Sequence, residues 1–204
     1  SRTKIKRVRK SILKRDRCIT LDSSASESVL VPRPTPKLNE PSHFMDTSDL
    51  VQVWRWIPKG LAELDLKRVF TTRQHGYSLT SLYYHCSWLE PLLLVLETEY
   101  GDIIGAFVSK SFDYRGVHYF GTGETFIFSL TSVPPTKYSW DPSKTDMALI
   151  YATDECLAFG AGFAIRIDSD LSKVASYASV TFDSPSLIPT GASKIINLEI
   201  YSFV

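Results

Sequence analysis

Short apolar runs separated by glycine-containing turns fill the sequence from Pro91 onward, and this pattern most restricts the possible folds. "PLLLVLETEYGDIIGAFVS" places two apolar runs around Gly101, as expected for a β-hairpin. "VHYFGTGETFIFSL" predicts two more strands, and "MALIYATDECLAFGAGFAIRIDSDL" predicts two or three. "ASKIINLEIYSFV" predicts a closing strand that alternates Ile195, Leu198 and Ile200 with polar residues. So many short strands indicate a two-sheet antiparallel β-sandwich.

Two amphipathic helices are predicted before these strands. In the first, the apolar positions follow the i, i+3, i+4, i+7 spacing of one helix face: Leu50, Val53, Trp54 and Ile57. Thr47 or Ser48 is expected to cap its first turn, and Pro58 is expected to end it or to start the next turn. "SLTSLYYHC" predicts the second helix, with Ser78 as its N-cap. The fold class is therefore α+β, mainly β: a sandwich flanked by helices.

The N-terminal part differs in composition from the rest. Residues 1–17 carry nine basic residues and one acid, whereas residues 18–204 sum to −7. A mildly acidic body argues against nucleic-acid binding. The basic run is expected to be a solvated tail or the end of an upstream domain, or else to bind an anionic membrane surface or a neighbouring domain. Its candidate residues for such binding are Lys4, Lys6, Arg7, Arg9, Lys10, Lys14, Arg15 and Arg17.

The sequence divides into a basic segment with a Ser/Pro-rich linker over residues 1–45 and a folded domain over 46–204. Such a linker indicates that the chain is part of a longer protein. Apolar runs stay far below the roughly 20 residues of a transmembrane helix, and no apolar region follows the basic start as in a secretory signal.

The three cysteines, Cys18, Cys86 and Cys156, are too few and too scattered for a disulfide framework or a structural zinc site. This pattern is typical of a reducing, cytoplasmic setting. Cys86 lies on the apolar face of the second helix and is expected in the core, whereas the exposure of Cys156 is open. Both remain candidates for oxidation.

Two glycine pairs resemble phosphate-binding loops at first sight: Gly121 with Gly123, and Gly160 with Gly162. A phosphate loop needs a helix after the glycines, and here β-branched and aromatic strands follow. We therefore expect glycine corners that permit close backbone approach. Glu124, beside the first corner, is expected to have a fixed hydrogen-bonding role that is structural rather than catalytic.

No catalytic or metal-binding spacing stands out among the remaining polar residues, and no metal or cofactor is expected. The histidines are dispersed along the chain, without the spacing of metal ligands. The tryptophans at 54, 56 and 88 are expected to pack in the core or against a helix rather than to form a ligand cage. A redox or hydrolytic site whose Cys and His meet only in the fold stays open as an alternative.

Five motifs in this order make the body resemble a TLDc domain, over about residues 48–204: "QHGYSLTSLYYHC", "PLLLVLETEYGDIIGAFVS", "YFGTGETFIFSL", "DECLAFGAGFAIRID" and "LEIYSF". "VWRWIPKGL" and "VFTTRQHGYSL" look most like the Skywalker-type subgroup, in which the TLDc domain follows a TBC-type Rab GTPase-activating domain. The TBC domain supplies the GTPase-activating residues of that subgroup, so this activity is not assigned to the present chain.

The resemblance implies a non-enzymatic interaction module of a trafficking regulator. It implies a role in synaptic-vesicle and endosomal traffic and endocytosis, on the cytoplasmic side of these membranes and in presynaptic terminals. It also implies resistance to oxidative stress, binding to the vacuolar proton pump, and contact with small GTPases through the rest of the parent protein.

Nine residues match the family motifs and become candidates for a partner surface or a structural role: Gly121, Gly123, Glu124, Gly160, Gly162, Asp168, Thr181, Phe182 and Asp183. Two stretches depart from the family. The glycine run "FGAGF" is shorter than usual, and "LSKVASYASV" replaces a basic, serine-rich loop. If these stretches form the partner surface, partner choice differs here.

Overall fold

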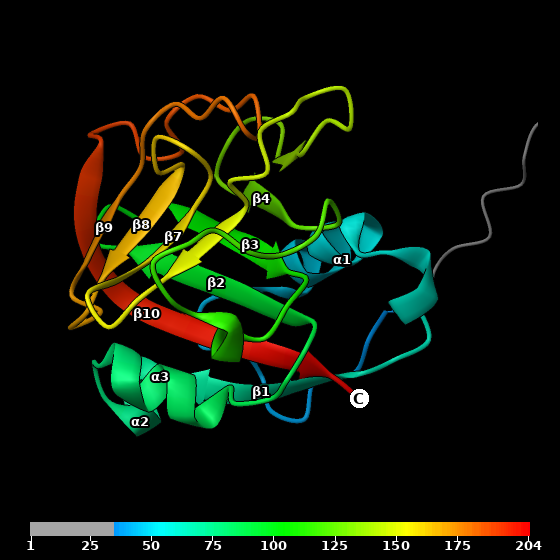
Figure 1. Cartoon of the computed structure of the whole chain (residues 1–204). Coiled ribbons are helices and arrows are strands. Elements are labelled where there is room, and N and C mark those ends of the chain that lie inside the picture. Colours follow the sequence, from blue (N-terminus) through cyan, green and yellow to red (C-terminus); the bar gives the residue numbers. More distant parts are fainter. Residues whose placement is uncertain (1–34) are drawn as a thin grey trace, which may run out of the picture. The chain divides into compact units, whose positions relative to one another are not determined.

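The computed structural model describes residues 35–204 as a two-layer β-sandwich with flanking helices, as predicted (Figure 1). The basic segment 1–17 and Cys18 lie outside the described residues. The helices are α1 (Thr47–Trp56), α2 (Thr72–His75) and α3 (Leu79–His85), with short 3₁₀ turns η1 (Lys59–Leu61) and η2 (Phe112–Tyr114). The strands are β1 (Leu66–Thr71), β2 (Leu92–Thr98), β3 (Ile103–Val108), β4 (Phe126–Ser129), β5 (Thr136–Ser139), β6 (Ile150–Ala152), β7 (Cys156–Phe159), β8 (Ile165–Asp168), β9 (Lys173–Ala175) and β10 (Ala192–Phe203).

The last strand, β10, belongs to both layers. Its first residues, 192–194, pair with β9, and from Ile195 onward it pairs with β2. The register shifts between Ile195 and Asn197, which marks an irregularity where the strand passes from one sheet to the other. The strand order is β5-β4-β3-β2-β10-β9-β8-β7-β6, and β1 pairs with the other edge of β10.

The main core lies between the two layers. Figure 1 shows β7 and β8 crossing in front of β2 and β3. Inward residues from both layers are buried, and many of them have no exposed surface, among them Leu94, Ile104, Ile127, Leu157, Phe159 and Ile167. Ile195, Leu198 and Ile200 join this core, as predicted, and the register shift after Ile195 brings it to the same face as Leu198.

A second core covers the outer face of the β2–β3–β4 sheet. Leu93, Val95 and Phe107 point to this face, and α1 packs over it with Leu50, Val53 and Trp54. Ile57 completes the helix contact at 1% exposure, which confirms the predicted apolar stripe. Both faces of this sheet are therefore buried, which explains why β2 reads as a continuous apolar run.

The cap of α1 differs from the prediction. Asp46, rather than Thr47 or Ser48, is the N-cap, and its side chain accepts the backbone N–H of Asp49. The Asp49 side chain in turn accepts the backbone N–H of Asp46, which closes a capping box. Asp46 is the N-cap because the helix already begins at Thr47, one of the two residues predicted to precede it as a cap.

Other local expectations are met in part. Gly101 turns the β2–β3 hairpin with φ +83°. "VHYFGTGETFIFSL" forms one strand, β4, and not two, because Phe120 makes only an isolated bridge to Ile150. Trp88 is 81% exposed, so its predicted core position is wrong, whereas Trp54 is buried. Ser78 precedes α3 but makes no capping hydrogen bond through its side chain.

Residues 36–45 are bound to the sheets, although the sequence reads as linker up to residue 45. Leu38 bridges to Leu66 in parallel, and Asn39 N–H donates to the Leu66 carbonyl. Ser42 and His43 reach β10, where Ser42 Oγ donates to Glu199 Oε2 over 2.6 Å. The packed part of the chain therefore begins before residue 46, because a buried carboxylate holds this segment.

Glu199 is fully buried and is the acceptor of a hydrogen-bond cluster. It receives the His43 backbone N–H, the Arg68 guanidinium at 3.1 Å and the Tyr201 hydroxyl at 2.6 Å, besides Ser42. Burial by itself raises the pKa of Glu199, but hydrogen bonds from Ser42, Tyr201 and His43 outweigh burial and hold this pKa below its ordinary value. The cluster ties the N-terminal segment, β1 and β10 together.

No helix among residues 35–204 combines the length and the apolar character that a bilayer crossing needs.

The Glu199 cluster yields a stability prediction. Glu199→Gln removes the buried counter-charge of Arg68 and leaves it only the half-exposed carboxylate of Glu40, so we expect the free energy of unfolding at pH 7 to fall by about 3 kcal/mol. Because the native pKa is depressed, the carboxylate's contribution is complete above the unfolded-state pKa of about 4.3 and is lost as pH falls through the lower native value. Urea unfolding should thus show the largest difference at pH 7 and a shrinking one below about pH 4. Glu63→Gln, at an exposed position, is the matched control, and equal urea midpoints for Glu199→Gln and wild type would refute the cluster's role.

Candidate functional site

The first glycine corner lies where β3 leads into β4. Gly121 has φ +103°, and a Cβ there would lie 2.8 Å from Ile150 Cδ1. Gly123 lies under the indole of Trp140, with 2.5 Å between a Cβ built at Gly123 and Trp140 Cε3. Both positions therefore require glycine for close approach, as the sequence predicts, and β4 rather than a helix follows them.

Glu124 differs from its expected role. Its side chain is exposed, and no residue of the described range donates a hydrogen bond to its carboxylate; only its backbone N–H is engaged, with Thr122 Oγ1 at 3.4 Å. The corner is held instead by Ser109, whose hydroxyl accepts the Thr122 N–H at 2.8 Å and pairs with Thr125 Oγ1 at 2.7 Å. Glu124 is thus a free surface carboxylate on a fixed turn.

The second glycine corner packs against the turn of residues 179–184. Gly160 has φ +79°, and a Cβ there would lie 2.5 Å from Ser179 Oγ and 3.0 Å from Phe182 Cδ2. Ser179 and Ser184 exchange two backbone hydrogen bonds, and Ser179 Oγ donates to the Ala161 carbonyl at 2.9 Å. Phe182 is 1% exposed, so the Phe of the Thr-Phe-Asp motif is buried against the backbone of Gly160.

Asp146 joins the two corners. Its backbone carbonyl accepts Trp140 Nε1–H at 2.6 Å, and its Oδ2 accepts Thr181 Oγ1–H at 2.6 Å. Thr181 Oγ1 also accepts the Ala161 N–H at 2.8 Å. A chain of contacts therefore runs from Gly123 through Trp140, Asp146 and Thr181 to the second corner.

We call residues 121–124, 140–147, 160–163 and 179–184 the loop platform. Beneath it the hydrogen bonds of Ser109, Asp146, Ser179 and Thr181 hold the base, although the buried Ser184 Oγ has no partner among the described residues, and above it several side chains point to solvent. Met147 is 49% exposed, and Val180 is 71% exposed, with its carbonyl held by Lys144 Nζ at 2.8 Å. Asp183 is also exposed, at a φ of +52°. The platform thus presents apolar and acidic groups on a hydrogen-bonded base.

Eight of the nine motif candidates belong to this platform, and Asp168 does not. Asp168 lies at the end of β8, where its Cα pairs with Cys156 and its Oδ1 accepts Arg166 Nη1 at 2.6 Å. β7 runs toward Gly160 and β8 runs away from it, so Asp168 marks the opposite end of this hairpin. Its contacts are those of a surface ion pair.

The two described cysteines are buried and form no disulfide. Cys86 is fully buried at the end of α3, and burial, with a smaller effect of Asp113, raises the pKa of its thiol. Cys156 is 6% exposed on β7, near Thr153. The raised pKa keeps Cys86 in the unreactive thiol form at neutral pH.

Sequence spacing missed a histidine pair that the fold creates. The rings of His75 and His85 stack with centroids 3.8 Å apart, and His75 Nδ1 accepts the Thr71 N–H at 3.1 Å. Burial lowers the pKa of His75, and so does the positive charge of His85. Within residues 35–204 no three His, Cys, Asp or Glu side chains are placed to hold a metal ion.

Sequence analysis also missed Trp140 and Asp146, which connect the two glycine corners, because the residues that they contact are distant in the sequence.

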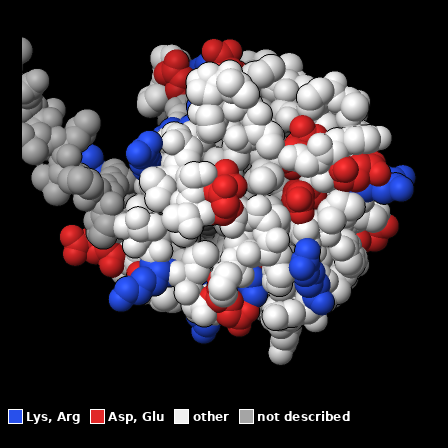
Figure 2. All heavy atoms as spheres, turned by 180° about the vertical axis from the view of Figure 1, so that it is seen from behind, with Lys and Arg blue, Asp and Glu red and all other residues white. Residues whose placement is uncertain are grey.

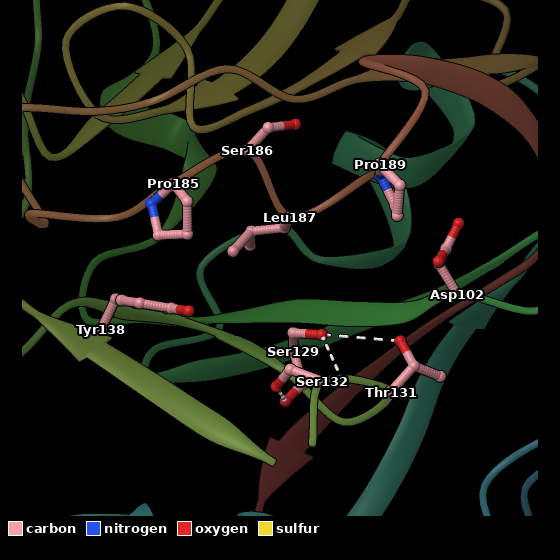
Figure 3. Close-up of a pocket in the computed structure, with 9 residues that line it drawn as sticks. All are labelled: Asp102, Ser129, Thr131, Ser132, Tyr138, Pro185, Ser186, Leu187 and Pro189. Carbon is pink, nitrogen blue, oxygen red and sulfur yellow. Dashed lines mark hydrogen bonds between the residues drawn. The ribbon is translucent and has the colours of Figure 1, made fainter. Parts of the chain in front are cut away.

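A cleft of about 200 Å³ opens between β5 and the loop of residues 185–189 (Figure 3). Tyr138 and Leu187 face each other across it, and Ser129, Thr131 and Ser132 line its floor. Asp102 lies at one end. The lining consists mainly of hydroxyl groups and prolines, with a single carboxylate and no nucleophile–base pair.

The charged side chains do not form a broad patch of one sign on the face opposite to that of Figure 1. Figure 2 shows Lys and Arg lying among Asp and Glu on this face, with most of the visible surface uncharged. A continuous basic stripe, as nucleic-acid backbones require, is absent from the described residues visible in this view.

Comparison with known proteins gives a match to the family model of the TLDc domain over residues 38–204. The chain belongs to the TLDc domain family. The match begins within the segment that the Glu199 cluster ties to the sheet, and it includes the whole loop platform.

Among curated relatives, GTPase-activating protein skywalker of Drosophila melanogaster is 32% identical over 178 residues, covering 79% of this chain and 30% of the relative. Oxidation resistance protein 1 of Bos taurus is 31% identical over 173 residues, 82% of this chain and 19% of the relative. TBC1 domain family member 24 of Xenopus laevis is 35% identical over 107 residues, 50% and 19% respectively. The TLDc chain therefore spans less than a third of these relatives.

The second corner yields a prediction about packing. Gly160→Ala forces a Cβ against Ser179 and Phe182 besides straining a positive φ, whereas Gly191→Ala strains a similar φ of +76° with no atom within 4 Å. We expect Gly191→Ala to cost about 1–2 kcal/mol and Gly160→Ala about 1–3 kcal/mol more. Urea unfolding measures both. Equal losses would show that Gly160 serves backbone conformation alone and that the corner is not packed on Phe182.

Proposed function

We propose that this TLDc domain is a non-enzymatic protein-interaction module of a larger trafficking regulator, and that it binds its partner through the loop platform. The observation that carries the proposal is the construction of the platform. Asp146 and Thr181 join the chain segments of the platform, and the joined base presents Val180 and Met147 to solvent. Glu124, on the first corner of the same platform, adds an unpaired carboxylate.

Exposed apolar side chains on a fixed base are what a binding surface requires. Exposure of the apolar side chains of Met147 and Val180 to water is unfavourable, so their burial by a partner would stabilise the complex. The hydrogen bonds beneath them reduce the conformational entropy lost on binding, because the turn is already ordered. Glu124 adds a charge that selects a partner with a complementary basic group.

The non-enzymatic part of the proposal rests on the described polar groups. Cys86 has a raised pKa and no route to solvent, and Cys156 is 94% covered. Among the carboxylates of the family motifs, Glu124 and Asp183 are exposed to solvent, and Asp168 forms an ion pair with Arg166. Rab GTPase activation is proposed to lie in a TBC domain of the parent protein; the Drosophila relative is named as a GTPase-activating protein.

The cellular role is proposed from the family. We place the domain at the cytoplasmic face of synaptic vesicles or endosomes, where it contributes to vesicle traffic and to oxidative-stress resistance. The vacuolar proton pump is the proposed partner of the platform, and small GTPases are proposed to bind elsewhere in the parent protein. Residues 1–17 are proposed to add contact with an anionic membrane, at about 1 kcal/mol per basic residue near its surface.

ATP hydrolysis by purified vacuolar proton pump tests this proposal. We expect the full chain to change the hydrolysis rate saturably and to release the peripheral sector of the pump. Val180→Asp, which adds a charge to the apolar contact, should raise the half-maximal concentration about tenfold, and Glu124→Arg should also raise it.

The matched control is Tyr100→Asp. Tyr100 is 70% exposed, close to the value for Val180, but it lies in the β2–β3 turn at the other end of β3 from Ser109. This variant should act like wild type. If wild-type chain changes neither hydrolysis nor sector release at saturating concentration, the pump is not its partner; if Val180→Asp and Tyr100→Asp act alike, the platform is not its binding surface.

A further inference from the structure

The outer edge of β5 differs from the other sheet edges. The free edge of β1 is covered by residues 37–39, which exchange backbone hydrogen bonds with Leu66. The free edge of β6 is covered by residues 116–120, through Gly116 N–H to Ala152 and the Phe120–Ile150 bridge. β5 pairs with β4 alone, and within residues 35–204 nothing bonds to its outer backbone groups.

The side chains of β5 alternate between two different surroundings. Lys137 lies opposite Phe128, on the outer face of the sheet, with its Nζ 4.8 Å from the centre of the Phe126 ring. Tyr138 lies opposite Ile127, on the inner face, where it packs against the main core and lines the cleft. A strand placed beside β5 would meet a cation on one face and the cleft on the other.

The cleft has the position of a side-chain pocket for such a strand. It lies on the inner face of the sheet, between Tyr138 of β5, Ser129 of β4 and the loop that carries Pro185 and Leu187 (Figure 3). Leu187 and the two flanking prolines give it an apolar wall, and Ser129 and Ser132 give it a polar floor. A volume of about 200 Å³ accepts one apolar side chain.

Lys137 determines the charge of the strand that fits. It is the only charged residue of β5, and no Asp or Glu of the described residues forms an ion pair with it. Partial burial lowers the pKa of Lys137, because no counter-charge offsets the lost water. Pairing two copies of β5 across this edge would bring two lysines together, which disfavours a second copy.

We propose that β5 is a β-augmentation site for an extended acidic segment of a partner protein. The segment adds as a strand, places an Asp or Glu opposite Lys137, and inserts the neighbouring apolar side chain into the cleft beside Tyr138. Because residues opposite each other share a face of the sheet, the recognised pattern is an acid adjacent to an apolar residue. Backbone hydrogen bonds supply affinity, and these two side chains supply specificity.

Selection from a phage-displayed library of random heptapeptides on the full chain tests this site. We expect enriched peptides to be proline-free and to share an acid next to an apolar residue. A synthetic copy of the most enriched peptide should bind about tenfold more weakly to Lys137→Glu, and its acid-to-lysine version should regain affinity for that variant. Amides in residues 136–139 that point away from β4 should exchange hydrogen at least about tenfold more slowly with peptide bound.

Lys67→Glu is the matched control, since Lys67 is an exposed lysine on β1, a strand whose edge is covered, and forms no ion pair within the described residues. It should bind the peptide like wild type and keep the wild-type urea midpoint, whereas Lys137→Glu should unfold in one cooperative transition at a slightly lower midpoint, because it loses the contact with the Phe126 ring. Failure to enrich this pattern, equal binding to Lys137→Glu and wild type, or amide protection confined to other strands would overturn the proposal. So would a dimer that forms through β5 and excludes the peptide.

Discussion

The passage of β10 from one sheet to the other is the constraint on which the rest of the fold depends. A 12-residue strand that pairs with β9 at its start and with β2 and β1 afterwards joins both layers covalently. Its inward residues fill the space between the layers, while Glu199 on the other side binds the segment before α1. One strand thus closes the sandwich and attaches its N-terminal cover.

The loop platform follows from this closure. With β6 to β9 stacked on β2 to β4, the turns that leave β3 and β7 come to the same end of the sandwich. Gly121 and Gly160 allow those turns to pass close to Ile150 and Ser179, and Asp146 bonds across the gap between them. The glycines therefore act in a structural role, as their sequence context indicates, and yet they create the surface that we assign to partner binding.

Local patterns in the sequence predicted what depends on neighbouring residues. The apolar stripe of Leu50, Val53 and Trp54 predicted α1, and Gly101 between two apolar runs predicted the β2–β3 hairpin. β1 was not predicted, because "LKRVFT" mixes charges with apolar residues and is recognisable as a strand only when β10 lies beside it. The family motifs supplied eight platform residues without indicating that they meet in space.

Residues whose role depends on distant partners could not be predicted. Glu199 reads as the solvent side of an alternating strand, and only its contacts with Ser42 and Arg68 make it a buried anchor. Trp140 and Asp146 belong to no recognisable sequence motif. Their role comes from contacts with Gly123 and Thr181, which are distant in the sequence. Trp88 reads as core by its hydrophobicity, but the turn after α3 directs it outward at a φ of +58°.

Site-specific photo-crosslinking tests the central claim, that the loop platform is the partner surface, most directly. Benzoylphenylalanine placed at position 180 or at position 100 of the full chain would be irradiated with membranes that contain the vacuolar proton pump. The account predicts crosslinks to a pump subunit from position 180 and none from position 100. Crosslinks from position 100 alone, or from neither position while the chain still alters ATP hydrolysis, would contradict it.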